Sequence, residues 1–180
     1  MRIKKMQLTH QDHYFQQKHF PLTMVCDNLT GPANIGALFR IAEAFGVQEI
    51  RFCGARPPVF SSPRMKKTAR AADKYVSYTY TGDTLQTLEL LKTEGYSIIS
   101  LEITDQSIPV SRFDFAPFQK IALVIGNESS GVSPEIIQAS DHAIHIEMFG
   151  NNSSMNVIQA TGIALYEITR QIKLPTPETL

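Results

Sequence analysis

Residues 121–131 read IALVIGNESSG, and this stretch decides the fold class. Its first five residues form an apolar run of strand length that is rich in β-branched side chains, and a loop bounded by Gly126 and Gly131 follows. Ser133 and Pro134 then stand where the N-cap and the first residue of a helix are expected. A strand, a glycine loop and a helix in this order place the loop at the carboxyl edge of a parallel sheet, where open α/β folds bind ligands.

The rest of the chain repeats this alternation of strands and helices. Residues 34–45 are typical of an amphipathic helix, with Leu38 and Phe39 on its apolar face, and Gly46 fits the position after a helix end. The alternation predicts an α/β fold with a mainly parallel sheet. It predicts strands over residues 22–27, 47–53, 75–80, 96–102, 121–125 and 142–146, and helices over residues 34–45 and 83–95, from residue 133, and over residues 154–172.

Length and composition are those of one globular domain. The chain has 180 residues, of which 43% are hydrophobic, and its formal net charge is zero. Overall charge therefore does not indicate a nucleic-acid partner, and only local basic patches can do so. We expect a polar arm over residues 1–20, a single domain over residues 21–175 and a short tail over residues 176–180.

Cys26 and Cys53 both lie in apolar runs that read as strands. They have neither the spacing of metal ligands nor a disulfide framework around them, and no metal site is expected. Buried free thiols are typical of a reducing compartment.

Because no apolar stretch approaches a membrane span and the N-terminus lacks the apolar region of a signal peptide, we expect a cytoplasmic protein without membrane contact.

The last predicted helix is apolar around most of its circumference. A helix of this kind is buried on more than one side, which in a chain of this size indicates a subunit interface as well as a core. The apolar residues are Met155, Val157, Ile158, Ile163, Ala164, Leu165 and Ile168.

Three polar clusters follow predicted strands. Single members have ordinary explanations: Asn34 and Ser154 as helix caps, Glu128 as a solvated loop carboxylate, and Arg40 as a cation on an exposed helix face. Together they indicate a functional site, because the carboxyl ends of parallel strands meet at one edge of a sheet. The clusters are Asn28, Asn34, Gly36 and Arg40; Gly126, Asn127, Glu128 and Gly131; and Gly150, Asn151, Asn152, Ser154 and Asn156.

Two phosphate-binding signatures are excluded. Gly126 and Gly131 have the spacing of P-loop glycines, but Val132 stands where the P-loop lysine must be. No G-x-G-x-x-G follows the first predicted strand, so a Rossmann dinucleotide site is unsupported.

Three segments resemble, in order and spacing, the motifs of one family. Residues 28–47 (NLTGPANIGALFRIAEAFGV) resemble the first motif of the SpoU (TrmH-type) RNA 2′-O-ribose methyltransferases of the SPOUT superfamily. Residues 121–133 (IALVIGNESSGVS) resemble the second motif and residues 144–168 (IHIEMFGNNSSMNVIQATGIALYEI) the third. Residues 67–76 (KTARAADKYV) are also similar to the segment between motifs one and two. The resemblance covers residues 22–172.

The resemblance implies a SPOUT fold with a deep C-terminal trefoil knot, and a homodimer formed through the C-terminal helix and the knot. It also implies that S-adenosylmethionine binds in the knot, held largely by main-chain groups. Carried over by motif, the cofactor-binding positions are Leu123, Val124, Ile125, Gly126, Ile146, Met148, Ser154 and Met155.

The family's functional polar residues correspond to Asn34, Arg40, Glu128, Ser154 and Asn156. Two roles stay open for Arg40: general base, or a clamp on the neighbouring phosphate that stabilises the alkoxide, since a guanidinium normally stays protonated. Asn34 is expected to orient Arg40 or the nucleotide, and Glu128 to hold first-motif residues or loop amides. Ser154 and Asn156 are expected to shape the pocket. The sequence departs from the family pattern at Met155, often a leucine, and at residues 129–130, where two serines replace a commoner glycine-bearing sequence.

The basic stretch over residues 64–74 is the candidate RNA contact, and charge alone fits a solvated surface loop equally well. We expect Arg64, Lys66, Lys67 and Arg70 to bind RNA, with Arg2, Lys4 and Lys5 secondary. Without an added RNA-binding domain, tRNA is favoured over ribosomal RNA. The alternatives are a ribosomal RNA enzyme, a catalytically silent RNA-binding member of the fold, a base methyltransferase and a small-molecule enzyme.

Overall fold

The computed structural model describes residues 16–152 and 154–172, and these contain a seven-stranded sheet in the order β3-β2-β1-β6-β4-β7-β5. Every neighbouring pair of strands in it is parallel. The predicted α/β class with a parallel sheet is therefore confirmed. The strands are β1 (Phe20–Asp27), β2 (Val47–Cys53), β3 (Ser77–Thr81), β4 (Ser97–Leu101), β5 (Ile108–Pro109), β6 (Ile121–Ile125) and β7 (His142–His145).

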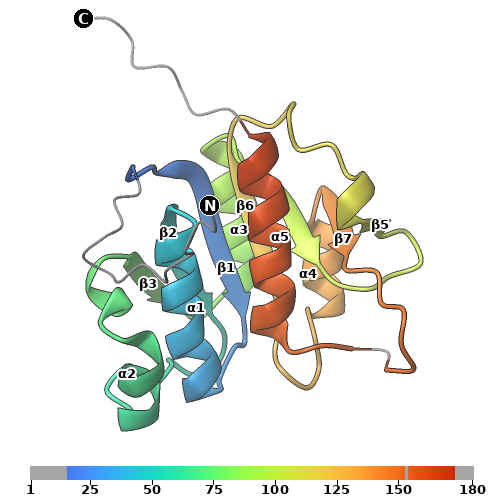
Figure 1. Ribbon diagram of the computed structural model, residues 1–180. Coiled ribbons are helices and arrows are strands. Elements are labelled where there is room, and N and C mark those ends of the chain that lie inside the picture. The colour runs from blue at the N-terminus through green and yellow to red at the C-terminus, as the bar shows by residue number, and fades with distance from the viewer. Residues whose placement is uncertain (1–15, 153, 173–180) are drawn as a thin grey trace, which may run out of the picture.

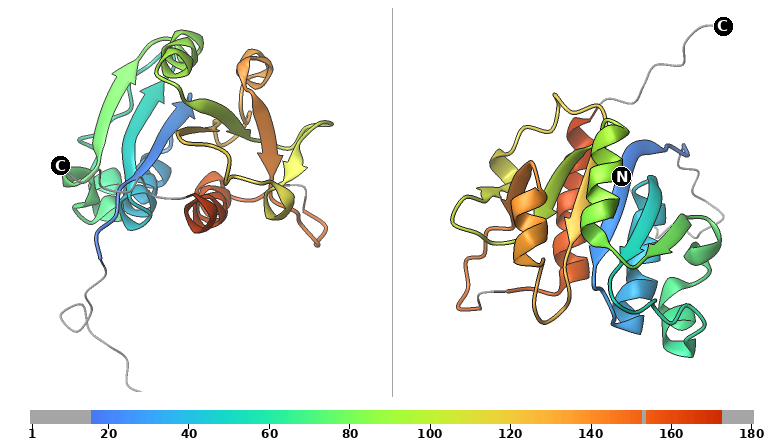
Figure 2. Two further views of the ribbon diagram at one scale, coloured as in Figure 1. Left: turned by 90° about the horizontal axis from the view of Figure 1, so that it is seen from above. Right: turned by 180° about the vertical axis from the view of Figure 1, so that it is seen from behind.

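Helices cover both faces of the sheet. Helices α1 (Pro32–Ala44) and α5 (Val157–Gln171) lie side by side on one face, together with the short helix α2 (Pro63–Ala69) (Figure 1). Helices α3 (Thr84–Thr93) and α4 (Pro134–Ala139) cover the opposite face, as both views in Figure 2 show. Two single turns of 3-10 helix, η2 (Ala72–Lys74) and η3 (Val110–Arg112), complete the described elements.

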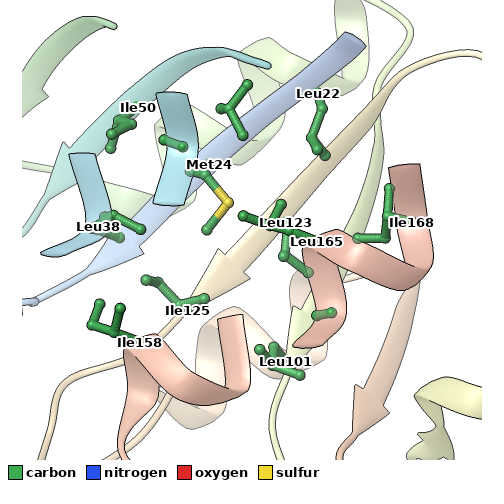
Figure 3. Close-up of a cluster of buried hydrophobic side chains, with 14 of the residues drawn as sticks. Leu22, Met24, Leu38, Ile50, Leu101, Leu123, Ile125, Ile158, Leu165 and Ile168 are labelled. Carbon is green, nitrogen blue, oxygen red and sulfur yellow. The ribbon is translucent and has the colours of Figure 1, made fainter. Parts of the chain in front are cut away.

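Strand β6 is the centre of the core. All five of its residues are completely buried, as expected for a parallel strand covered on both faces. Leu123 and Ile125 contribute to the larger apolar cluster beneath α1 and α5, where Leu38 and Leu165 also lie (Figure 3). Val124 contributes to a second cluster beneath α3 and α4. The loop that follows β6 therefore starts from a rigid base.

The last helix begins later than the sequence pattern predicts. Helix α5 starts at Val157 rather than at residue 154, because Asn156 and not Ser154 is its N-cap. The Asn156 side-chain oxygen accepts hydrogen bonds from the main-chain N–H groups of Ile158 (2.9 Å) and Gln159 (3.4 Å). Residues 154–156 consequently lie before the helix rather than in it.

The basic stretch is helical rather than a loop. Helix α2 begins at Pro63 and ends at Ala69, and the next residue, Arg70, has the left-handed backbone (φ 48°) that stops a helix. It packs closely on α1 at Gly36, where an added Cβ would lie 2.0 Å from Thr68 Oγ1 and 2.3 Å from the carbonyl oxygen of Met65. Gly36 therefore serves this contact and not the polar site to which the sequence pattern assigned it.

Two smaller differences concern segment boundaries. The segment predicted as a plain connection over residues 104–117 contains β5 and η3. The first strand begins at Phe20, one residue inside the predicted arm. The rest of that arm up to residue 15, including the secondary RNA contacts expected there, lies outside the described residues, as do residues 173–180.

Candidate functional site

A cavity of about 320 Å³ opens at the carboxyl edge of the sheet. Its walls come from the ends of β4, β6 and β7 and from the segment that enters α5, so it occupies the place where parallel sheets bind ligands. The lining residues are Leu101, Glu102, Ile103, Gly126, Asn127, Glu128, Ser129, Ser130, Gly131, His145, Ile146, Met148, Ser154, Met155, Val157 and Ala160.

The glycine loop after β6 is held in a tight shape by its own main chain. The N–H of Asn127 donates to the carbonyl of Gly131 (2.9 Å), and the N–H of Gly131 donates back to that of Asn127 (3.0 Å). An added Cβ at Gly126 would lie 2.0 Å from the carbonyl carbon of Gly131, so the turn admits only glycine there. The Asn127 side-chain oxygen accepts from the N–H groups of Ser129 (2.9 Å) and Ser130 (3.3 Å). The two serines that depart from the family pattern are thus ordered through their main chain.

Glu128 joins this loop to the first polar cluster. Its carboxylate accepts hydrogen bonds from the N–H of Gly31 (2.7 Å), the N–H of Thr30 (3.4 Å) and Nδ2 of Asn34 (3.0 Å). Partial burial alone would raise the pKa of Glu128, but the hydrogen bonds from Asn34 and from main-chain N–H groups outweigh it, and the pKa is lowered from its ordinary value. These contacts join Glu128 to residues of the first motif and to main-chain amides of the loop before α1.

Asn34 extends the connection to the third cluster. Its side-chain oxygen accepts a hydrogen bond from Nδ2 of Asn156 (3.2 Å), the residue that caps α5. A continuous hydrogen-bonded path therefore runs from the glycine loop through Glu128, Asn34 and Asn156 to the start of the last helix. These three predicted catalytic residues come together although 122 positions separate the outermost pair.

Arg40 stands apart from this network. It lies on α1 six residues after Asn34, about 120° around the helix, and its side chain is exposed. Within the described part of the chain no hydrogen bond or ion pair joins Arg40 to Asn34, which is engaged with Glu128 and Asn156 instead. The structure therefore gives no support to the expectation that Asn34 orients Arg40.

The predicted cofactor positions divide into two groups. Gly126, Ile146, Met148, Ser154 and Met155 line the cavity. Leu123, Val124 and Ile125 do not, because they lie within β6 with no exposed surface.

Sequence reasoning missed six lining residues, of which Glu102 and His145 are polar. Both stand at the carboxyl end of a strand, and that position was the available signal. The other four are Leu101, Ile103, Val157 and Ala160.

The Asp27 side chain, on the face of the sheet that α3 and α4 cover, connects the end of β1 to the end of the glycine loop. Asp27 ends β1 and is 1% exposed. Its carboxylate accepts from the N–H (2.9 Å) and hydroxyl (2.6 Å) of Ser133 and from the hydroxyl of Thr84 (2.9 Å). The start of α4, directly after the glycine loop, is thereby tied to the strand that precedes the first polar cluster.

The predicted RNA-binding side chains Arg64, Lys66, Lys67 and Arg70 are all exposed on or next to α2. Lys66 forms an ion pair with Asp73, so part of its charge is neutralised. Through the close contact at Gly36, this basic surface is rigidly attached to α1, the helix that carries Asn34 and Arg40.

Three further features bear on the expectations from sequence. Cys26 and Cys53 are free and buried, and burial raises the pKa of both thiols, which makes them unreactive. Among the residues that the structure describes, no cluster of His, Cys, Asp or Glu is arranged to hold a metal ion. No helix in the same ranges has the length and apolar character needed to cross a membrane.

The fold and site define an α/β protein with a cavity at the carboxyl edge of its sheet, beside a hydrogen-bonded network of Glu128, Asn34 and Asn156. Residues 21–166 match the SpoU rRNA Methylase family. The chain therefore belongs to this family, and the assignment from sequence is confirmed.

Two relatives and one solved structure illustrate the similarity. The chain is 30% identical over 87% of its length to tRNA (guanosine(18)-2′-O)-methyltransferase of Aquifex aeolicus, and 29% identical over 89% to 23S rRNA (guanosine-2′-O-)-methyltransferase RlmB of Acinetobacter baylyi. It spans 72% and 64% of these two proteins, respectively. The crystal structure of the A. aeolicus TrmH/SpoU tRNA modifying enzyme superposes with a TM-score of 0.77 at 30% identity, covering 86% of this chain and 77% of that one.

Proposed function

We propose that the protein transfers a methyl group from S-adenosylmethionine to a ribose 2′-hydroxyl of RNA. Family membership supports the reaction, and both named relatives are RNA 2′-O-methyltransferases. The observation that carries the proposal is the path from Glu128 through Asn34 to Asn156, which joins the three family motifs to one another beside the cavity that Glu128 lines. Such an intact network is not expected in a member that has lost its activity.

The cavity suits the cofactor in size and chemistry. Its volume of about 320 Å³ is within the range of small-molecule sites. Ile146, Met148 and Val157 offer apolar contacts for a planar base, and the ordered main chain of residues 126–131 offers hydrogen-bonding groups for the polar parts. When bound, S-adenosylmethionine supplies an electrophilic methyl group on a positively charged sulfur.

The protein's task is then to position the nucleophile and stabilise its charge. The ribose 2′-oxygen bonds to the methyl carbon, the carbon–sulfur bond breaks with its electrons going to sulfur, and the hydroxyl proton leaves to phosphate or solvent. Arg40 binds the phosphate next to that ribose and stabilises the developing alkoxide. Glu128 and Asn34 act by holding the loops in place.

The exposed cations beside α1 form the RNA-binding surface in this proposal. Arg64, Lys67 and Arg70 contact the RNA backbone, and Lys66 contributes less because of its ion pair with Asp73. The favoured substrate is tRNA, which is the substrate named for the A. aeolicus relative. A ribosomal RNA substrate is the alternative.

The assembly proposed is a homodimer formed through α5. Ile163 and Tyr166 are exposed on that helix, by 43% and 61%, which is unusual for apolar side chains of a core helix. We also propose that the C-terminal part is knotted, as the resemblance to the SPOUT superfamily implies. A crystal structure whose density is traced through residues 101–172 tests the knot directly.

The two buried free thiols suit a reducing compartment, and we propose that the protein is located in the cytoplasm. Fluorescence microscopy of a tagged protein tests this location.

Methyl transfer from labelled S-adenosylmethionine to RNA lacking the modification tests the reaction. Total RNA is separated by size after the reaction and then digested to nucleosides. A labelled 2′-O-methylnucleoside in the tRNA fraction, made by the wild type, supports the proposal, and label in the ribosomal fraction selects the alternative substrate. Label on a base, or no transfer by a protein that binds the cofactor, contradicts it.

A further inference from the structure

The cavity contains two carboxylates that differ in how much of their hydrogen-bonding capacity is already used. Glu128 receives four donors: Gly31 N–H and Asn34 on Oε1, and Thr30 N–H and Asn127 on Oε2. Each carboxylate oxygen accepts about two hydrogen bonds, so Glu128 has little capacity left for a ligand.

Glu102 is held in place but keeps capacity. Its Oε2 accepts one hydrogen bond, from the N–H of Val132 (2.9 Å), and its Oε1 accepts one, from the N–H of Ile103 (3.0 Å). In the described part of the chain no other donor reaches either oxygen, and no cation pairs with the carboxylate. One acceptor position on each oxygen therefore stays open beside the cavity.

The position of this carboxylate is fixed from both sides. Glu102 directly follows β4, and its Oε2 lies against Gly131, where an added Cβ would come within 2.3 Å of it. The Val132 contact holds it against the end of the glycine loop, and the Ile103 contact holds it against its own strand end. A prepositioned pair of oxygen acceptors is what a ligand with two adjacent hydroxyl donors requires.

We propose that Glu102 binds the ribose of the cofactor by accepting hydrogen bonds from its 2′- and 3′-hydroxyls. An acidic side chain in this role is a general solution for nucleotides bound at the carboxyl edge of parallel sheets. The inference rests on the proposed function, and it adds a side-chain contact to a cofactor site otherwise attributed to main-chain groups.

Calorimetric titration with S-adenosylhomocysteine and with its 2′-deoxy analogue tests this contact. The proteins are the wild type, Glu102→Ala, Glu102→Gln and the control Glu135→Ala, which removes an exposed carboxylate on α4 away from the cavity lining. Thermal unfolding of each variant checks its folding.

Glu102→Ala is expected to weaken S-adenosylhomocysteine binding about 10- to 100-fold, the effect of losing hydrogen bonds to a charged group. The affinity of Glu102→Gln for S-adenosylhomocysteine is expected to lie between those of the wild type and Glu102→Ala. The affinity of Glu135→Ala is expected to match that of the wild type. The decisive result is the difference between ligands: the wild type prefers the ribose ligand over the deoxy analogue, and Glu102→Ala loses most of that preference.

Equal weakening of both ligands by Glu102→Ala would show that Glu102 only supports the loop and would overturn the inference. Unchanged binding by a folded Glu102→Ala would overturn it as well. Both results leave the proposed function intact. If the wild type binds neither ligand and transfers no methyl group, the proposed function itself fails, and the inference fails with it.

Discussion

Arg40 is exposed, and among the described residues its side chain makes no hydrogen bond or ion pair, so its role depends on what it does to the RNA. Because it clamps phosphate and stabilises the alkoxide in our proposal, Arg40→Ala is expected to lower the rate of methyl transfer about 100-fold or more, with little change in cofactor affinity. Lys92→Ala removes an exposed cation on α3, across the sheet, and is the control.

The pH profile separates the two roles of Arg40. A residue that acts as general base must lose its proton, so its replacement would remove a limb of the pH–rate profile. A charge that stabilises the alkoxide lowers the rate at every pH and leaves the shape of the profile unchanged. Single-turnover rates of wild type and Arg40→Ala over a range of pH make the distinction, and a changed shape would assign the base role.

Glu128 is expected to give the fold a pH-dependent contribution. Because its folded-state pKa is lowered, its stabilising effect is present above the unfolded-state pKa and is lost as the pH falls through the folded-state value. Glu128→Gln is expected to reduce the free energy of unfolding at pH 7 by about 1 kcal/mol at most, since the carboxylate is largely exposed. Denaturant titrations should show this difference shrinking toward acidic pH, and a difference independent of pH would contradict the ionised role.

At the residue scale, sequence identified the polar groups better than their partners. Asn34, Glu128 and Asn156 were selected because each follows a strand, and the parallel sheet does bring them together. Their hydrogen bonds depend on loop paths that no local pattern encodes. Glu102 was missed because a single glutamate after a strand is ordinary. Only its contacts with Gly131 and Val132, which are distant in the sequence, distinguish it.

At the scale of elements, apolar runs predicted the buried strands well. The bounds of β2 and β6 agree with the sequence pattern, and in β6 continuous burial leaves a clear signal. The two-residue strand β5 is too short for any periodicity, and α2 was hidden within a stretch selected for its charge. Tertiary packing on Gly36 places α2.

We expect the exposed cations on and next to helix α2 to determine how RNA binding depends on salt concentration. Replacing Arg64, Lys67 and Arg70 together by glutamine removes three exposed charges, so the plot of log affinity against log salt concentration should become shallower by about 2 to 3. The single change Lys66→Gln should have a smaller effect because Lys66 already pairs with Asp73. Fluorescence anisotropy with unmodified tRNA at several salt concentrations provides the slopes, and an unchanged slope for the triple variant would place the RNA elsewhere.

The close contact between α1 and α2 at Gly36 predicts that a larger residue there lowers the stability of the fold. Gly36→Ala forces a methyl group against the main chain of α2 and is expected to cost about 1 to 3 kcal/mol of unfolding free energy. Gly82→Ala is the matched control, because an added Cβ there meets no atom within 4 Å. Denaturant unfolding measures both. Equal stabilities would mean that α2 is not seated on α1 in this way.

At the scale of the whole molecule, the exposed side of α5 needs a partner. Its inner face is completely buried at Leu165 and Ile168, yet Ile163 and Tyr166 on the outer face are exposed to solvent within a single copy. In the proposed homodimer this face is covered by a second copy, so a charge placed there becomes buried without a partner when the dimer forms.

Tyr166→Glu is therefore expected to convert the dimer into a monomer, which sedimentation velocity at several protein concentrations measures. Tyr75→Glu is the matched control, because Tyr75 is 75% exposed and lies outside α5. A monomeric Tyr166→Glu protein with unchanged near-UV circular dichroism would locate the interface on α5. If that variant remains dimeric, another surface joins the copies. If the wild type is itself a monomer, the exposed apolar face of α5 is not a site of self-association.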